Sequence, residues 1–63
     1  MRKLSTPAHP IYVDLTQIFA FEPQGDGTIM LVFPGNVEYV ITEVTVDELL
    51  EFIRADKKAA QQK

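Results

Sequence analysis

The clearest pattern along the chain is a pair of apolar runs, 28–33 and 37–42, on either side of Pro34-Gly35-Asn36. Both runs are rich in β-branched and aromatic residues, and proline followed by glycine is typical of a tight turn. We therefore predict a β-hairpin with a three-residue loop. A two-residue loop would place Glu38 among the large apolar side chains, because a slip of one residue in the register moves every side chain of the strand to the other face of the sheet. The predicted cross-strand pairs are Phe33 with Val37, Leu31 with Tyr39, and Ile29 with Ile41.

A second β pattern precedes the hairpin. Residues 11–15 alternate apolar and polar, which indicates a half-buried strand. The alternation breaks at Thr16-Gln17, where we predict a short turn capped by the Asp14 carboxylate. If the inward face continues beyond this turn, Phe19 and Phe21 lie on the same side as the apolar face of the hairpin.

The loop at 23–27 connects this segment to the hairpin and contains two glycines, a proline and an aspartate. A five-residue loop pairs Phe21 with Ile29 and Phe19 with Leu31. The opposite side of the sheet is then too apolar for an ordinary solvated face. We predict that it is a protein interface made of Ile18, Ala20, Met30, Val32 and Val40.

A helix is predicted from Thr45 onward. Thr45 and Glu48 have the spacing of a capping box, and Val44 and Leu49 that of a hydrophobic staple. Apolar residues then recur on one helical stripe, which must cover the sheet. The stripe contains Val46, Leu49, Leu50 and Ile53, with Phe52 at its margin. After Ile53 no large apolar residue follows, so we expect the basic end of the helix to fray.

These elements predict a small α+β domain, an antiparallel β meander of three or four strands with one C-terminal helix packed on one face. We assign residues 11–56 to the domain, 1–10 to an extended proline-containing arm that is ordered only if it docks, and 57–63 to a frayed basic tail. The predicted core contains Val13, Leu15, Phe19, Phe21, Ile29, Leu31, Phe33, Tyr39, Ile41, Leu49, Leu50 and Ile53.

The length of the chain makes this core marginal. Sixty-three residues bury only about 60% of the surface of the unfolded chain, and such domains usually need disulfides, a metal or oligomerisation. The chain has no cysteine and one histidine, His9, which argues against disulfides, a zinc site or another cofactor. Of these three means of stabilisation only self-association remains, so we expect a homo-oligomer.

Charge is distributed unevenly along the chain. The net charge is −3, yet every lysine and arginine lies within residues 1–3 or 54–63, so the body is acidic. An acidic body is explained by a solvated surface, by a basic protein partner, or by mimicry of nucleic acid. No apolar run is long enough to cross a bilayer and no signal peptide is evident, so we expect a cytoplasmic protein.

The residues needed for catalysis are not found together in the sequence. Ser5 is the only serine, and both Ser5 and His9 lie in the proline-containing arm without an acidic residue nearby. The acids of the body have structural explanations as caps, loop residues or outward strand residues. Since catalysis needs a nucleophile, a base and an orienting group together, we expect the protein not to be an enzyme.

From Ile18 onward the chain resembles the FlbD family of small flagellum-associated proteins. The resemblance is carried by Ile18, Glu22-Pro23, Thr28-Ile29, Leu31, Gly35, Tyr39-Val40-Ile41, Glu43, Glu48 and Ile53. This chain differs in its glycine loop at 25–27 and in the proline before the turn glycine. The resemblance implies a strand, a loop, a hairpin and a short helix, and a small regulatory protein.

Residues 10–22 are also similar to the opening strands of LytTR-type DNA-binding domains. A complete domain of that type needs roughly as many residues again, and an acidic body repels phosphates. The sequence thus leaves three functions open: a non-catalytic protein-binding module, which we prefer; a nucleic-acid binder; and an acidic inhibitor that mimics nucleic acid.

Overall fold

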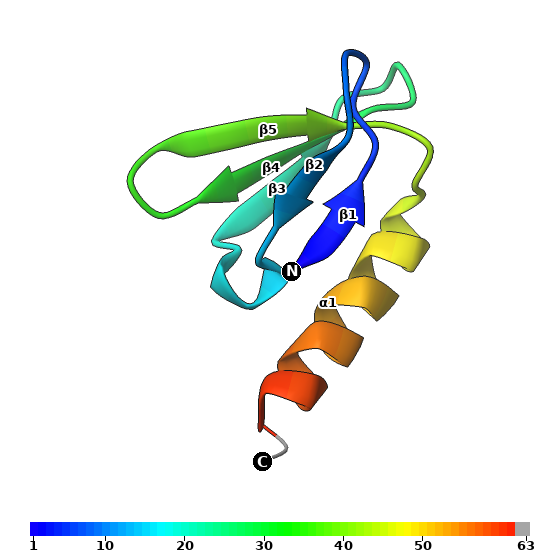
Figure 1. The fold of residues 1–63 in the computed structure, drawn as a ribbon. Helices are drawn as coiled ribbons and strands as arrows, with labels where there is room; N and C mark the ends of the chain where they lie inside the picture. The colour runs from blue at the N-terminus through cyan, green and yellow to red at the C-terminus, as the bar shows by residue number, and fades with distance from the viewer. Residues whose placement is uncertain (62–63) are drawn as a thin grey trace.

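The computed structural model describes residues 1–61, which form five short strands, a 3-10 turn and one helix (Figure 1). Strands β1 and β2 form a two-stranded antiparallel sheet, and β3, β4 and β5 form a three-stranded antiparallel sheet in that order. The predicted α+β class is therefore confirmed. In chain order the elements are β1 (Arg2–Leu4), β2 (Ile11–Val13), η1 (Leu15–Gln17), β3 (Ala20–Pro23), β4 (Ile29–Phe33), β5 (Val37–Ile41) and α1 (Val46–Gln61).

The hairpin of β4 and β5 has the predicted three-residue loop. Gly35 and Asn36 both adopt positive φ, at 83° and 61°, which lets the chain reverse within so few residues. The three predicted cross-strand pairs are all present, so the register is confirmed. Along β4, alternate residues are buried and half-buried, which places one face of the strand in the core.

The predicted pairing of β3 with β4 is wrong by two residues. Phe21 pairs with Leu31 rather than Ile29, and Pro23 extends the strand to pair with Ile29. The connecting loop consequently runs over residues 24–28, and its ends are joined by a hydrogen bond from the Gln24 N–H to the Thr28 carbonyl oxygen. A shift of two keeps each side chain on its predicted face, so Phe21 still packs against the core.

The predicted burial of Phe19 is also wrong, since its side chain is 79% exposed. The Phe19 N–H donates to the Val32 carbonyl oxygen, while Ala20 is the strand partner of Val32. Two consecutive residues thus oppose one, which is the pattern of a β-bulge. The extra residue changes the alternation, so Ile18 packs against the core and Phe19 does not.

The N-terminal segment is part of the domain. Arg2–Leu4 pairs with Ile11–Val13, and Leu4 is only 3% exposed. Beyond β1, the Ser5 carbonyl oxygen accepts a hydrogen bond from the Thr42 N–H, which joins the end of β1 to the end of β5. The division between an arm at 1–10 and a domain at 11–56 is therefore corrected, because the arm docks and contributes to the core.

The core lies between the three-stranded sheet, the β1–β2 hairpin and the helix (Figure 1). Two predicted core residues on other elements are not buried in it: Tyr39 is 39% exposed, and Leu50 is half-buried outside the core cluster. Ile53 packs against the core as predicted, and Phe52, predicted at the margin of the stripe, does so in place of Leu50, so the buried stripe is rotated from the predicted one. The buried residues are Leu4, Val13, Leu15, Ile29, Leu31, Phe33, Ile41 and Leu49.

The helix begins as predicted. The Thr45 N–H donates to the Glu48 carboxylate at 2.9 Å, and the Glu48 N–H donates to the Thr45 hydroxyl at 3.1 Å, which completes the capping box. The helix continues to Gln61, and the last two residues of the predicted frayed tail, 62 and 63, lie outside the described residues. No helix within residues 1–61 is long and apolar enough to cross a membrane.

Docking of the N-terminal hairpin gives a first prediction. Leu4→Ala should lower the free energy of unfolding by about 2–5 kcal/mol, because it leaves a cavity in the core. Urea denaturation would measure the change, with Lys3→Ala as a control at an exposed position on the same strand. A Leu4→Ala variant as stable as Lys3→Ala would show that β1 is not docked in solution.

The end of the helix gives a second prediction. Residues 58–61 are exposed, so deletion of 58–63 should leave the melting temperature almost unchanged. Thermal unfolding followed by circular dichroism would test this. A decrease of more than about 5 °C, roughly 1 kcal/mol for a domain of this size, would contradict the prediction and indicate that this segment docks.

Candidate protein-binding interface

The candidate interface is the face of the three-stranded sheet that points away from the core. Because side chains alternate along β4, Met30 and Val32 project from the opposite side to Ile29, Leu31 and Phe33. The strand register places their neighbours in two rows across the sheet. One row is Ala20, Val32 and Glu38, and the other is Glu22, Met30 and Val40.

This face is uncovered, whereas the opposite face is closed. Ala20 is exposed, Val40 is 39% exposed, and Met30 and Val32 are half-buried. The inward residues Ile29, Leu31 and Ile41 are at most 3% exposed, because the β1–β2 hairpin and α1 pack on their side. Four of the five predicted interface residues thus lie together on the outward side of the sheet.

Phe19 joins these residues, and Ile18 does not. The Phe19 side chain borders a shallow depression together with Val32 and the turn at Pro34, which places it beside the apolar rows. Sequence reasoning reversed the two positions because it carried the alternation unchanged through Phe19 and Ala20, where the bulge lies. The broken alternation at Gln17 and the capping Asp14 were the available signals, but neither indicates a bulge at Phe19 and Ala20.

Two carboxylates lie at opposite corners of the face, Glu22 at the end of one row and Glu38 at the end of the other. Both glutamates are exposed. No lysine or arginine occurs between residues 4 and 53 to neutralise them. The face therefore combines an apolar centre with an acidic margin, which resembles the apolar core and polar rim of protein interfaces.

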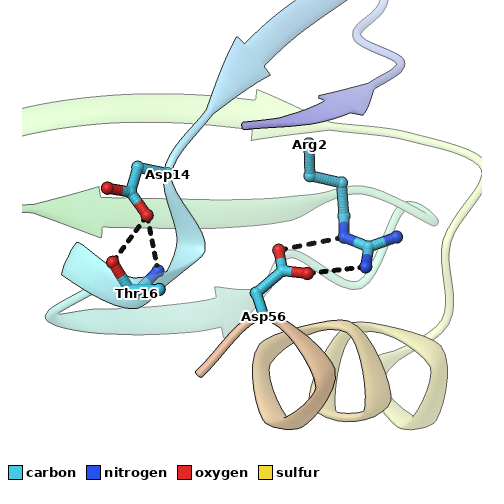
Figure 2. Close-up of polar contacts among 4 residues, drawn as sticks. All are labelled: Arg2, Asp14, Thr16 and Asp56. Carbon is cyan, nitrogen blue, oxygen red and sulfur yellow. Dashed lines mark hydrogen bonds and ion pairs between the residues drawn. The ribbon is translucent and has the colours of Figure 1, made fainter. Parts of the chain in front are cut away.

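The N-terminal strand and the helix are joined by one ion pair (Figure 2). The Arg2 guanidinium donates to both carboxylate oxygens of Asp56, at 3.1 and 2.7 Å. The guanidinium also lies 4.2 Å from the centre of the Phe52 ring, a cation–π contact. The Arg2 hydrogen bonds lower the pKa of Asp56, so this carboxylate stays ionised.

Two exposed aspartates form the same local motif. One Asp14 oxygen accepts hydrogen bonds from both the N–H and the hydroxyl of Thr16, which confirms the predicted cap (Figure 2). One Asp26 oxygen accepts from both groups of Thr28 in the same manner. In each case the threonine hydrogen bonds lower the pKa of the carboxyl, the hydroxyl having the larger effect.

The residues considered for catalysis lie apart from this interface. His9 is exposed in the turn between β1 and β2, where one ring nitrogen lies 3.2 Å from the Pro10 carbonyl oxygen. The Thr6 hydroxyl accepts hydrogen bonds from two N–H groups of this turn, those of Ala8 and His9. Among residues 1–61, no three histidine or acidic side chains are placed to hold a metal ion together.

Comparisons of the chain with protein-family models, curated proteins and solved structures found no match. The interface is therefore interpreted from its own geometry and charge.

The ion pair between Arg2 and Asp56 predicts a dependence on pH. The pKa of Asp56 is lowered in the folded state, so the stabilisation is present above the ordinary aspartate pKa of about 3.9 and is lost as the pH falls through the folded-state value. Because the pair is partly exposed, Asp56→Asn should cost about 0.2–1 kcal/mol near pH 7.

Urea denaturation at several pH values would measure this difference. The stabilities of the wild type and Asp56→Asn should converge as the pH falls below about 4. Glu51→Gln, at an exposed position on the same helix, is the control for the loss of one charge. A difference between the wild type and Asp56→Asn that does not change with pH would contradict an ionic origin.

Proposed function

We propose that this chain is a small, non-catalytic protein-binding module with a regulatory role, which acts in the cytoplasm as a homo-oligomer. The observation that carries the proposal is the uncovered outward face of the β3–β4–β5 sheet. Its apolar centre contains Phe19, Ala20, Met30, Val32 and Val40.

The energetics favour a partner on this face. Burying one valine or methionine side chain contributes about 1.5–3 kcal/mol, while a domain of this size has only a few kcal/mol of stability. The helix and the β1–β2 hairpin already lie against the inner face. A second copy of the chain supplies a matching apolar face through a twofold axis, the commonest symmetry of homo-oligomers.

The size of the face sets the expected strength of this association. Three strands spaced about 4.8 Å apart and four or five residues long present an area of roughly 14 by 17 Å at most. A stable interface usually buries about 800 Å² on each partner, several times this projected area. We therefore propose a weak dimer that forms at concentrations up to about 100 µM, with the Glu22 and Glu38 carboxylates in the solvated rim.

The resemblance to the FlbD family supports the regulatory part of the proposal. Several residues that carry it, including Leu31, Tyr39 and Ile41, belong to the paired strands of the hairpin. A role in nucleic-acid binding is disfavoured because no lysine or arginine occurs between residues 4 and 53 to neutralise phosphates.

The proposal predicts that Val32→Glu gives a less stable monomer. The substitution introduces a charge at the centre of the outward face, and Val32 is not part of the buried core. Sedimentation velocity of the wild type and the variant over a concentration range to about 100 µM would measure the association, and denaturation would measure stability. Wild-type chains should dimerise and Val32→Glu chains should not.

Ala55→Glu is the matched control, because it adds the same charge at an exposed position on the helix. This variant should associate as the wild type does. Wild-type protein that remains monomeric at the highest concentration would contradict the proposed homo-oligomer. The outward face would then be expected to bind a different protein.

A further inference from the structure

A second surface lies on the opposite side of the sheet, where the inner face extends beyond its cover. Val37 and Tyr39 are on the same face as Leu31 and Ile41, yet they are 40% and 39% exposed, whereas Leu31 and Ile41 are fully buried. A groove separates this uncovered end of the hairpin from β2, whose Tyr12 is 63% exposed. The groove is distinct from the outward face and does not depend on the proposed function.

Three aromatic residues line the groove. Tyr12 comes from β2, Phe33 from β4 and Tyr39 from β5. The Phe33 and Tyr39 rings are in edge-to-face contact, with centres 5.8 Å apart and planes at 75°, so Tyr39 is held by a buried neighbour. Tyrosine is enriched in protein interfaces because it offers a large, rigid and amphipathic surface.

One acidic residue, Asp14, also borders the groove. One of its oxygens is occupied by the two hydrogen bonds from Thr16, and the other points away from Thr16 (Figure 2). The N-terminal ammonium of Met1 acts on this carboxylate through space but makes no ion pair with it within 4.0 Å in the described part of the chain. Arg2, the nearest arginine in sequence, is engaged by Asp56.

The volume of the groove is about 210 Å³. Sites for drug-sized molecules usually have about 300–1,000 Å³, so this groove has room for a single large side chain. Aromatic faces beside an ordered carboxylate are suited to a cation, and a planar guanidinium satisfies both groups better than an ammonium. The same chemistry occurs within the protein, where Arg2 contacts both the Phe52 ring and the Asp56 carboxylate.

We propose that this groove binds an arginine side chain from an extended segment of another protein, with the guanidinium between the tyrosine rings and the Asp14 carboxylate. The acidic body of the chain, which has no lysine or arginine between residues 4 and 53, favours the approach of such a segment. Aliphatic neighbours of the arginine would contact Val37 and the edge of β2.

The test is a titration of the isotope-labelled chain with the peptide acetyl-Gly-Leu-Arg-Leu-Gly-amide, followed by backbone amide shifts. A peptide concentration of about 5 mM detects dissociation constants into the millimolar range. Saturable shifts are expected at Tyr12, Asp14, Val37 and Tyr39. A peptide with citrulline in place of arginine has nearly the same shape without the charge, and it should bind about two- to fivefold more weakly.

Two aspartate variants provide a matched comparison. Asp14→Asn should weaken arginine-peptide binding about two- to fivefold, whereas Asp26→Asn should not, although both remove one charge from the same hydrogen-bonded motif. Tyr12→Thr, at an exposed strand position, should weaken binding to a similar extent through the loss of a ring.

The titration is repeated on the Val32→Glu variant, so that a failure of self-association cannot be mistaken for a failure of the groove. Equal binding of the citrulline peptide would overturn the proposal. Equal effects of Asp14→Asn and Asp26→Asn, or shifts confined to the outward face, would do so as well.

Discussion

The structure depends on the alternation of side chains along β4, the central strand. Both faces of this strand are apolar, but only the face with Ile29, Leu31 and Phe33 is enclosed. The turn at Pro34-Gly35-Asn36 fixes the register of β5 against it, and a slip of one residue would exchange the enclosed face for the open one. The β1–β2 hairpin, the 3-10 turn and the helix supply the buried residues that cover the enclosed face.

The short chain explains why one face stays open. Within residues 1–61, the elements outside the three-stranded sheet are one helix, one two-stranded hairpin and one 3-10 turn, and all of them contribute to the same core cluster. A chain of this length has little material for a second layer. The inner face is closed completely near Ile41, where β1 meets β5, and remains accessible near Val37 at the other end. Both candidate binding surfaces are thus consequences of incomplete coverage.

Polar contacts within the described residues fall into two kinds. The Thr45–Glu48 and Asp14–Thr16 contacts connect residues two or three apart, and they determine where the helix and the 3-10 turn begin. The Arg2–Asp56 pair connects residues 54 apart and ties the first strand to the helix. The local contacts can form in a short segment, whereas the ion pair requires the whole fold.

The sequence by itself determined the β4–β5 register, the helix start and most of the outward face, because each depends on residues close together in the chain. Only the tertiary structure decided that Leu4 is buried, since nothing in residues 1–10 indicates the surface they contact. It also decided that Phe19 rather than Ile18 is exposed. A bulge shifts the alternation by one residue, so the residues before it change faces, and its position is set by pairing with Val32. The alternation of residues along one segment carries no information about that pairing.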